Sequence, residues 1–443
     1  MNSRLTLTYC LPVAMAALLP LAQPASAANL SEIYQLAVEK DSVIQASRAQ
    51  RDAAIEALPL ARSAMLPQVA FAADIAENES NDDFNGRFTS DSYSASVTQN
   101  IFNSTASRSI KKARVTVEQA EATLQEAEQN LMFRTAQAYF NVLTAREAYS
   151  AASSSREAIA SQTEQAERRF DVGLSAITDV KEAQAQLDLA VAREVVAENQ
   201  LALAKEALRV IINQEVPPLD GLKENAELTA PEPTSVDEWI AVAEKNNPRL
   251  EAARKDFDLA TADISIERAG RLPTVALVGG YQNQSSDNIT TTGLLQADNE
   301  SGQIRIQLDL PIITGGRTSS LVRQAKSRAT QASFNLETVQ RAVVQETRDA
   351  YLTVLADISQ TNALQQALNS TEVAKDATQA GFDAGTRTAV EVLVSLRDTF
   401  NAYADYAAAR HQYVVSSLQL RLAAGILAQK HIDSISKSLT PGS

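Results

Sequence analysis

One segment of the chain reads Gln303-Ile304-Arg305-Ile306-Gln307-Leu308-Asp309-Leu310. Polar and apolar side chains alternate along it without a break. Successive side chains of a β-strand point to opposite faces of the sheet. The segment therefore predicts a strand with one apolar and one polar face.

Three further segments repeat this alternation, at residues 69–75, 93–101 and 275–281, and the second of them places Ile101 on its apolar face. Segments of about ten residues that alternate in this way are typical of transmembrane β-strands. An amphipathic sheet on a soluble core would alternate too, but four such segments favour membrane strands. The expected lipid-facing side chains include Ile304, Ile306 and Leu308.

Long helices account for most of the remaining chain. Glycine and proline are both absent from residues 103–172, 174–216 and 317–380. A helix of about 70 residues would extend roughly 105 Å, at 1.5 Å per residue. Helices of this length do not pack inside an ordinary globular domain.

The chain contains an internal repeat. Leu66-Pro67-Gln68-Val69 matches Leu272-Pro273-Thr274-Val275, and Ala138–Leu143 matches Ala350–Leu355, so the offset grows from 206 to 212 residues. Repeats this long indicate duplication of a whole structural unit. The predicted division is a first repeat at 28–216, a linker at 217–235, a second repeat at 236–428 and a C-terminal tail at 429–443.

The first 27 residues have the features of a secretory signal peptide. Arg4 supplies the positive start, Leu11–Leu21 the apolar stretch, and Ala25-Ser26-Ala27 the small-residue cleavage pattern. The sole cysteine, Cys10, lies within this segment. We expect cleavage after Ala27 and a mature chain without thiols.

Composition excludes several classes of function. The formal net charge is -14 and no basic patch is visible, which argues against nucleic acid as a partner. The chain has only two histidines and one cysteine, too few for a Cys/His metal site. We therefore expect no cofactor, no metal, no catalytic residues and no enzyme activity.

Four strands cannot close a transmembrane barrel, because the smallest outer-membrane barrels have about eight. An open sheet edge in lipid would leave backbone groups without hydrogen bonds. The chain must then oligomerise, as a dimer with eight strands or a trimer with twelve. A conducting pore favours at least three copies. The external loops are expected at residues 77–90 and 283–301.

The chain resembles the TolC family of outer-membrane efflux proteins over essentially all of its mature length. The resemblance rests on four segments in a duplicated order: Leu66-Pro67-Gln68, Ala138–Leu143, Arg169–Leu174 with Ile177–Val180, and Gly385–Thr388. It implies a mainly α chain that forms a trimer in the outer membrane of a Gram-negative bacterium. The trimer would combine a shared twelve-stranded β-barrel with a periplasmic tunnel of long helical hairpins.

The resemblance also implies partners and sites. Expected partners are a periplasmic adaptor protein, an inner-membrane transporter of the ABC, RND or MFS type, and outer-membrane lipid; the exported cargo would be small molecules, polypeptides or both. Adaptor docking is expected at the two hairpin tips, at Gly173, Leu174, Ser175, Gly385 and Thr386.

The periplasmic gate is expected beside these tips. Asp179 and Arg387 would link different hairpins, and three copies of Glu391 would form an acidic ring. The chain departs from the family at two gate positions, where Phe382 replaces a linking tyrosine and Val394 replaces a second acidic residue. A simple turn with solvated charges would explain these residues without any gate.

Two other classes of protein remain open from the sequence. A secreted or periplasmic coiled-coil scaffold would explain the helices but not the strands. A periplasmic adaptor would carry one long hairpin, whereas this sequence predicts two.

Overall fold

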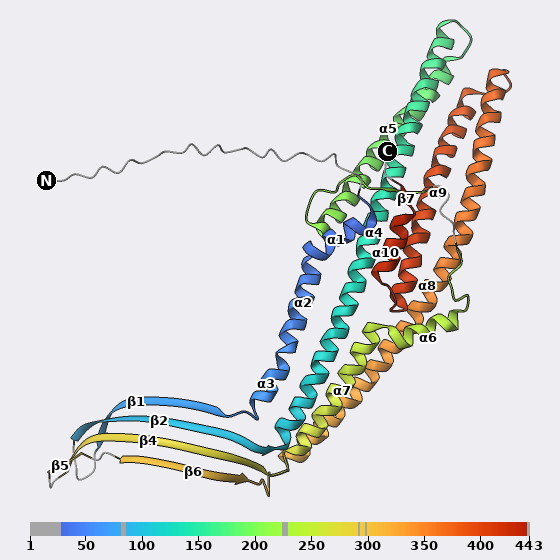
Figure 1. The fold of residues 1–443 in the computed structure, drawn as a ribbon. Helices are drawn as coiled ribbons and strands as arrows, with labels where there is room; N and C mark the ends of the chain where they lie inside the picture. Colours follow the sequence, from blue (N-terminus) through green and yellow to red (C-terminus); the bar gives the residue numbers. More distant parts are fainter. Residues whose placement is uncertain (1–27, 81–85, 224–228, 291–292, 297–298, 441–443) are drawn as a thin grey trace, which may run out of the picture.

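The computed structural model describes residues 28–80, 86–223, 229–290, 293–296 and 299–440. The predicted signal peptide, 1–27, lies outside the described residues. The molecule is elongated, with a sheet at one end and two helical hairpin tips at the other (Figure 1). No helix in the described ranges is long and apolar enough to cross a membrane.

The sheet consists of four long antiparallel strands and one short one. Their bounds are β1 Gln68–Ser80, β2 Gly86–Asn103, β4 Thr274–Thr290, β5 Gly293–Gln296 and β6 Asn299–Asp309. β2 lies between β1 and β4, and β4 pairs with β6 along its length and with β5 at its far end. Strands of the two sequence repeats thus form one continuous sheet.

The strands extend further than the sequence predicts. β1 and β2 stay paired from Gln68↔Thr98 to Ser80↔Gly86, so most of the expected loop 77–90 is strand. Most of the second expected loop, 283–301, belongs to β4, β5 and β6. These segments are polar on both faces, and for that reason the alternation of side chains did not reveal them.

Two long hairpins form the helical part. The first joins α4 Ser104–Asp171 to α5 Ile177–Ile212, and the second joins α8 Arg317–Asp383 to α9 Ala389–Ala423. Asn103 caps α4 by accepting a hydrogen bond from the Ala106 N–H at 2.9 Å. The absence of Gly and Pro therefore located these helices correctly.

Shorter helices line the strand-proximal parts of α4 and α8. They are α1 Leu30–Lys40, α2 Ser42–Ile55 and α3 Ala57–Ser63 in the first repeat, and α6 Val236–Asn246 and α7 Pro248–Ala269 in the second. The same order of elements thus occurs in both halves. The extra residues of the second half lie at 310–316, between β6 and α8, whereas β2 runs directly into α4.

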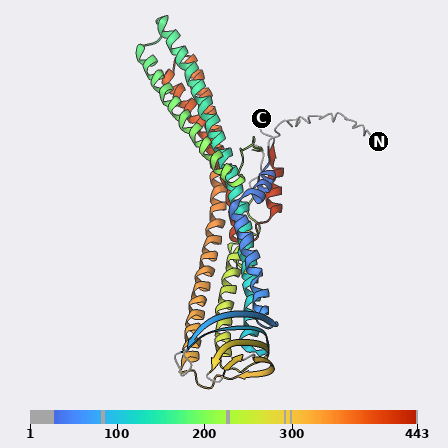
Figure 2. The same cartoon turned by 90° about the vertical axis from the view of Figure 1, so that its left-hand side faces the viewer.

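A strap crosses the middle of the helices on one side of the molecule (Figure 2). We use the name strap for residues 217–223 and 229–235 together with α10 Gln429–Lys437 and β7 Leu439–Thr440. β7 pairs with β3 Gly221–Leu222, and the main core cluster, which includes Tyr139 and Phe140, lies at this level. Residues 429–440, expected as a tail, are therefore folded against the linker; 441–443 lie outside the described residues.

Candidate functional site

The sheet presents one apolar face across all its long strands. Val69 of β1 pairs with Val97 of β2, which pairs with Gly279 of β4, which pairs with Ile304 of β6. Directly paired residues share a face. Ile304 and Ile306 are 84% and 72% exposed in the single chain. No helix of the described chain covers this face (Figure 1).

The opposite face is polar. Ser96 of β2 pairs with Ala70 of β1, and Gln307 and Arg305 occupy this face on β6. The register shifts between Asn100 and Phe102, so Phe102 and not Ile101 pairs with Val275. A β-bulge inserts one residue into a strand and reverses the faces beyond it. The assignment of Ile101 to the apolar row was therefore wrong, and Phe102 takes that place.

Both hairpin tips turn with the same backbone geometry. Gly173 and Gly385 have φ of 77° and 76°, a region that glycine adopts without strain. The Leu174 N–H donates to the Arg169 carbonyl at 2.8 Å, and the Thr386 N–H donates to the Gly381 carbonyl at 2.8 Å. The five expected docking residues thus lie on two matching, exposed turns: Gly173, Leu174, Ser175, Gly385 and Thr386.

Asp179 lies in the first turn of α5 and is engaged locally. Its carboxylate accepts hydrogen bonds from the Ser175 hydroxyl at 2.9 Å and the Ala176 N–H at 3.4 Å. A carboxylate at a helix N-terminus also interacts favourably with the helix dipole. Asp179 therefore fixes the start of α5 in the single chain.

Arg387 pairs with Glu391 of its own hairpin. The guanidinium lies 2.7 Å from the Glu391 carboxylate, which also accepts from the Thr388 N–H at 2.8 Å. The Thr388 hydrogen bond and then Arg387 lower the pKa of Glu391 below its ordinary value. Val394 lies beside these groups in a groove of about 310 Å³. Among the described residues of the single chain, no ion pair joins Asp179 to Arg387.

Phe382 contacts a residue that the sequence analysis did not select. The guanidinium carbon of Arg169, on α4, lies 4.6 Å from the centre of the Phe382 ring, on α8. This cation–π contact connects the two hairpins next to their tips. Arg169 belongs to the segment on which the resemblance rests, but nothing in its spacing indicated an aromatic partner on the other hairpin.

Comparison with known proteins agrees with this architecture. Residues 33–214 and 239–426 match the family described as outer membrane efflux protein. Outer membrane protein TolC of Vibrio cholerae is 38% identical over 428 residues, covering 96% of this chain and 97% of its own. Alkaline protease secretion protein AprF of Pseudomonas aeruginosa is 25% identical, covering 96% of this chain and 90% of its own.

Among solved structures, the outer membrane channel CmeC of Campylobacter jejuni superposes with a TM-score of 0.78 at 16% identity. The match covers 99% of this chain and 98% of that one. The predicted fold class and family are thereby confirmed, and a pore-free scaffold or an adaptor is rejected. The chain belongs to the outer membrane efflux protein family, a family of outer-membrane channel proteins and not of enzymes.

Proposed function

We propose that three copies of this chain form one exit duct, with a shared twelve-stranded barrel in the outer membrane and a helical tunnel in the periplasm. The observation that carries the proposal is the open, one-sided sheet. Among the described residues, β1 pairs only with β2 and β6 pairs along its length only with β4. Closure through neighbouring copies would satisfy both edges, as lipid requires.

The internal repeat supports the same assembly in the helical part. Within one chain α4 packs on α9, and this contact buries Phe140 and Val415, which are 1% and 6% exposed. Their repeat equivalents, 212 residues away, are Leu352 on α8 and Leu203 on α5, which are 55% and 61% exposed. A neighbouring copy that packs its α5 on this α8 would repeat the buried contact between chains.

The tips and the gate complete the proposal. The two exposed turns would receive a periplasmic adaptor, and through it an inner-membrane transporter of the ABC, RND or MFS type. AprF is named for protease secretion, so polypeptide as well as small-molecule cargo is included. Asp179 and Arg387 would link hairpins in the closed trimer, and three Glu391 carboxylates would line the mouth.

Disulfide cross-linking tests the assembly. The one cysteine of the chain is Cys10, in the predicted signal peptide, so introduced cysteines face no native thiol in the mature protein. Leu203→Cys combined with Leu352→Cys should give covalent trimers on oxidation. Either single variant is the control and should not give them. Failure of the double variant to cross-link between chains would contradict the proposed packing.

A further inference from the structure

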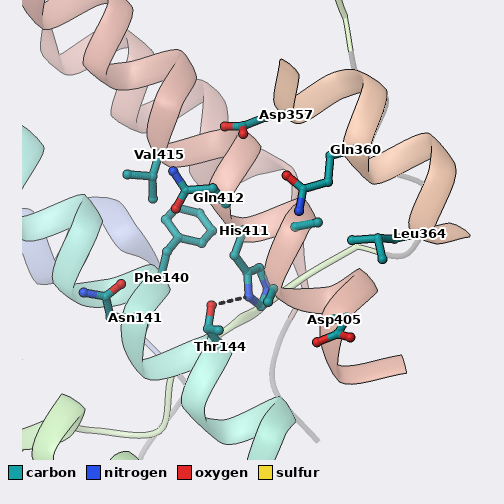
Figure 3. Close-up of a pocket in the computed structure, with 12 residues that line it drawn as sticks. Phe140, Asn141, Thr144, Asp357, Gln360, Leu364, Asp405, His411, Gln412 and Val415 are labelled. Carbon is teal, nitrogen blue, oxygen red and sulfur yellow. Dashed lines mark hydrogen bonds between the residues drawn. The ribbon is translucent and has the colours of Figure 1, made fainter. Parts of the chain in front are cut away.

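A polar cavity of about 480 Å³ lies between α4, α8 and α9, close to the middle of the helices (Figure 3). Phe140 forms its apolar wall, while carboxylate, amide and imidazole groups from all three helices surround the rest. The polar lining residues are Asn141, Thr144, Asp357, Gln360, Asp405, His411 and Gln412.

Asp357 is a buried carboxylate without a counter-ion. It is only 8% exposed and accepts a hydrogen bond from the Ser416 hydroxyl. No lysine, arginine or histidine of the described chain forms an ion pair with it. Buried charges in proteins are normally paired, because an unpaired charge loses its hydration without compensation. A second carboxylate, Asp405, lies at the exposed side of the cavity and adds negative charge.

His411 does not supply the missing positive charge. It is 5% exposed, and its Nδ1 is hydrogen-bonded to the Thr144 hydroxyl at 2.9 Å. Burial, followed by the charges of Arg410 and Arg146, lowers its pKa to about 4, so the ring is neutral at neutral pH. Within the described chain, Nε2 has no hydrogen-bond partner. A neutral ring thus offers one free polar atom beside an unpaired carboxylate.

The cavity opens on the side opposite the strap. The hydroxyls of Tyr139 and Tyr351 donate to carbonyls of the strap, at Asp220 and Thr234. Gln360 follows Tyr351 by two and a half turns, and a half turn places a residue on the opposite face of a helix. In a ring of helices the additional strap layer lies outside, because three copies would fill the axis. The cavity then faces the lumen of the duct.

We infer that this cavity is a cargo-contact site for small organic cations, whose ammonium or amidinium group pairs with Asp357 while an aromatic or apolar part packs on Phe140. The inference rests on the proposed function and specifies a class of cargo for it. Each trimer would carry three such sites at one level of the tunnel. Gln412 and Gln360 provide amide groups for further hydrogen bonds to the cargo.

Binding of ethidium, a fluorescent aromatic cation, to the trimer in lipid nanodiscs tests the inference. Asp357→Asn keeps the shape of the side chain and removes its charge, and should weaken binding roughly tenfold because charge-assisted hydrogen bonds are the strong ones. The matched control is Asp349→Asn, an exposed aspartate on the same helix outside the cavity, which should bind like the wild type. Gln360→Lys places a competing cation in the cavity and should also weaken binding.

Unchanged ethidium affinity in both Asp357→Asn and Gln360→Lys would overturn the inference, as would an equal loss in Asp349→Asn. The neutral probe N-phenyl-1-naphthylamine should not distinguish Asp357→Asn from the wild type; if it does, charge is not the determinant and the inference fails. Mass and conductance are measured on the same samples. Conducting trimers with unchanged affinity would reject the site alone, whereas the absence of trimers would reject the proposed function.

Discussion

Ile306 lies in the middle of the apolar face of the sheet, paired with Leu277 of β4. Ile306→Arg would place a charge in hydrocarbon, which costs about 2–4 kcal/mol near the bilayer midplane. We expect much less assembled protein in the outer membrane, measured as trimer in membrane extracts. Gln307→Arg, on the polar face, is the control and should assemble normally; equal losses in both variants would contradict the assigned faces.

Phe382 tests a single contact between the hairpins. A cation–π pair at an exposed site contributes about 0.5–1 kcal/mol, and three copies would act on one opening. Phe382→Leu, which removes the ring from Arg169, should therefore raise single-channel conductance in a planar bilayer. Phe334→Leu, at an exposed phenylalanine of the same helix, should leave the opening unchanged. Wild-type conductance in Phe382→Leu would leave the contact without a role in the gate.

His411 makes stability depend on pH. Its folded-state pKa is lowered from 6.5 to about 4, so the unfolded chain binds the proton more readily. Stability is therefore lost as pH falls from about 6.5 towards 4, by up to roughly 3 kcal/mol per chain. His411→Gln should show a smaller drop in melting temperature between pH 7 and pH 4.5 than the wild type. An unchanged drop would mean that other groups cause the acid sensitivity.

At the scale of elements, the junction between α9 and α7 depends on one glycine. Gly425 has φ of 71°, and a Cβ there would lie 2.4 Å from Cα of Asn247, the residue that caps α7. Gly425→Ala should therefore destabilise the fold by roughly 2–4 kcal/mol, from backbone strain and overpacking together.

Thermal unfolding of Gly425→Ala checks this expectation against Gly173→Ala. Gly173 also has a positive φ, but a Cβ there would meet no atom within 4 Å. The tip variant should lose only about 1–2 kcal/mol, from backbone conformation alone. Equal losses would show that close packing at Gly425 contributes nothing.

The elements that the sequence predicted correctly are those with a strong local pattern. The run without Gly and Pro located α4 and α8, and strict alternation located β6. The outer halves of the strands carry polar side chains on both faces, so their pairing partners alone keep them extended. The bulge at Ile101 likewise depends on how β2 meets β4. No residue near it marks the shift in register.

The site could be predicted in part for the same reason. The glycines of both tips were evident from their repeated turns. The local partners of Asp179 and Arg387 follow from helix-capping geometry that the sequence analysis did not apply to them. The contact of Arg169 with Phe382 and the cavity around Asp357 join residues far apart in the chain. Such contacts appear only once the hairpins are placed side by side.

At the scale of the whole molecule, a duplicated unit leaves its own interfaces incomplete. The apolar residues that one half buries against the other have exposed equivalents on α5 and α8, and the sheet ends in two unpaired edges. Both features are relieved by a closed ring of copies. With four long strands from each chain, three copies supply the twelve strands of a barrel wide enough for a pore.

The native mass of the protein extracted from membranes in detergent tests this account most directly. With the detergent contribution subtracted, the account predicts three times the mass of one mature chain, independent of protein concentration over the working range. A stable monomer that remains folded and soluble, or a closed dimer, would contradict it. In either case the exposed edges and faces of the single chain would have to be satisfied in another way.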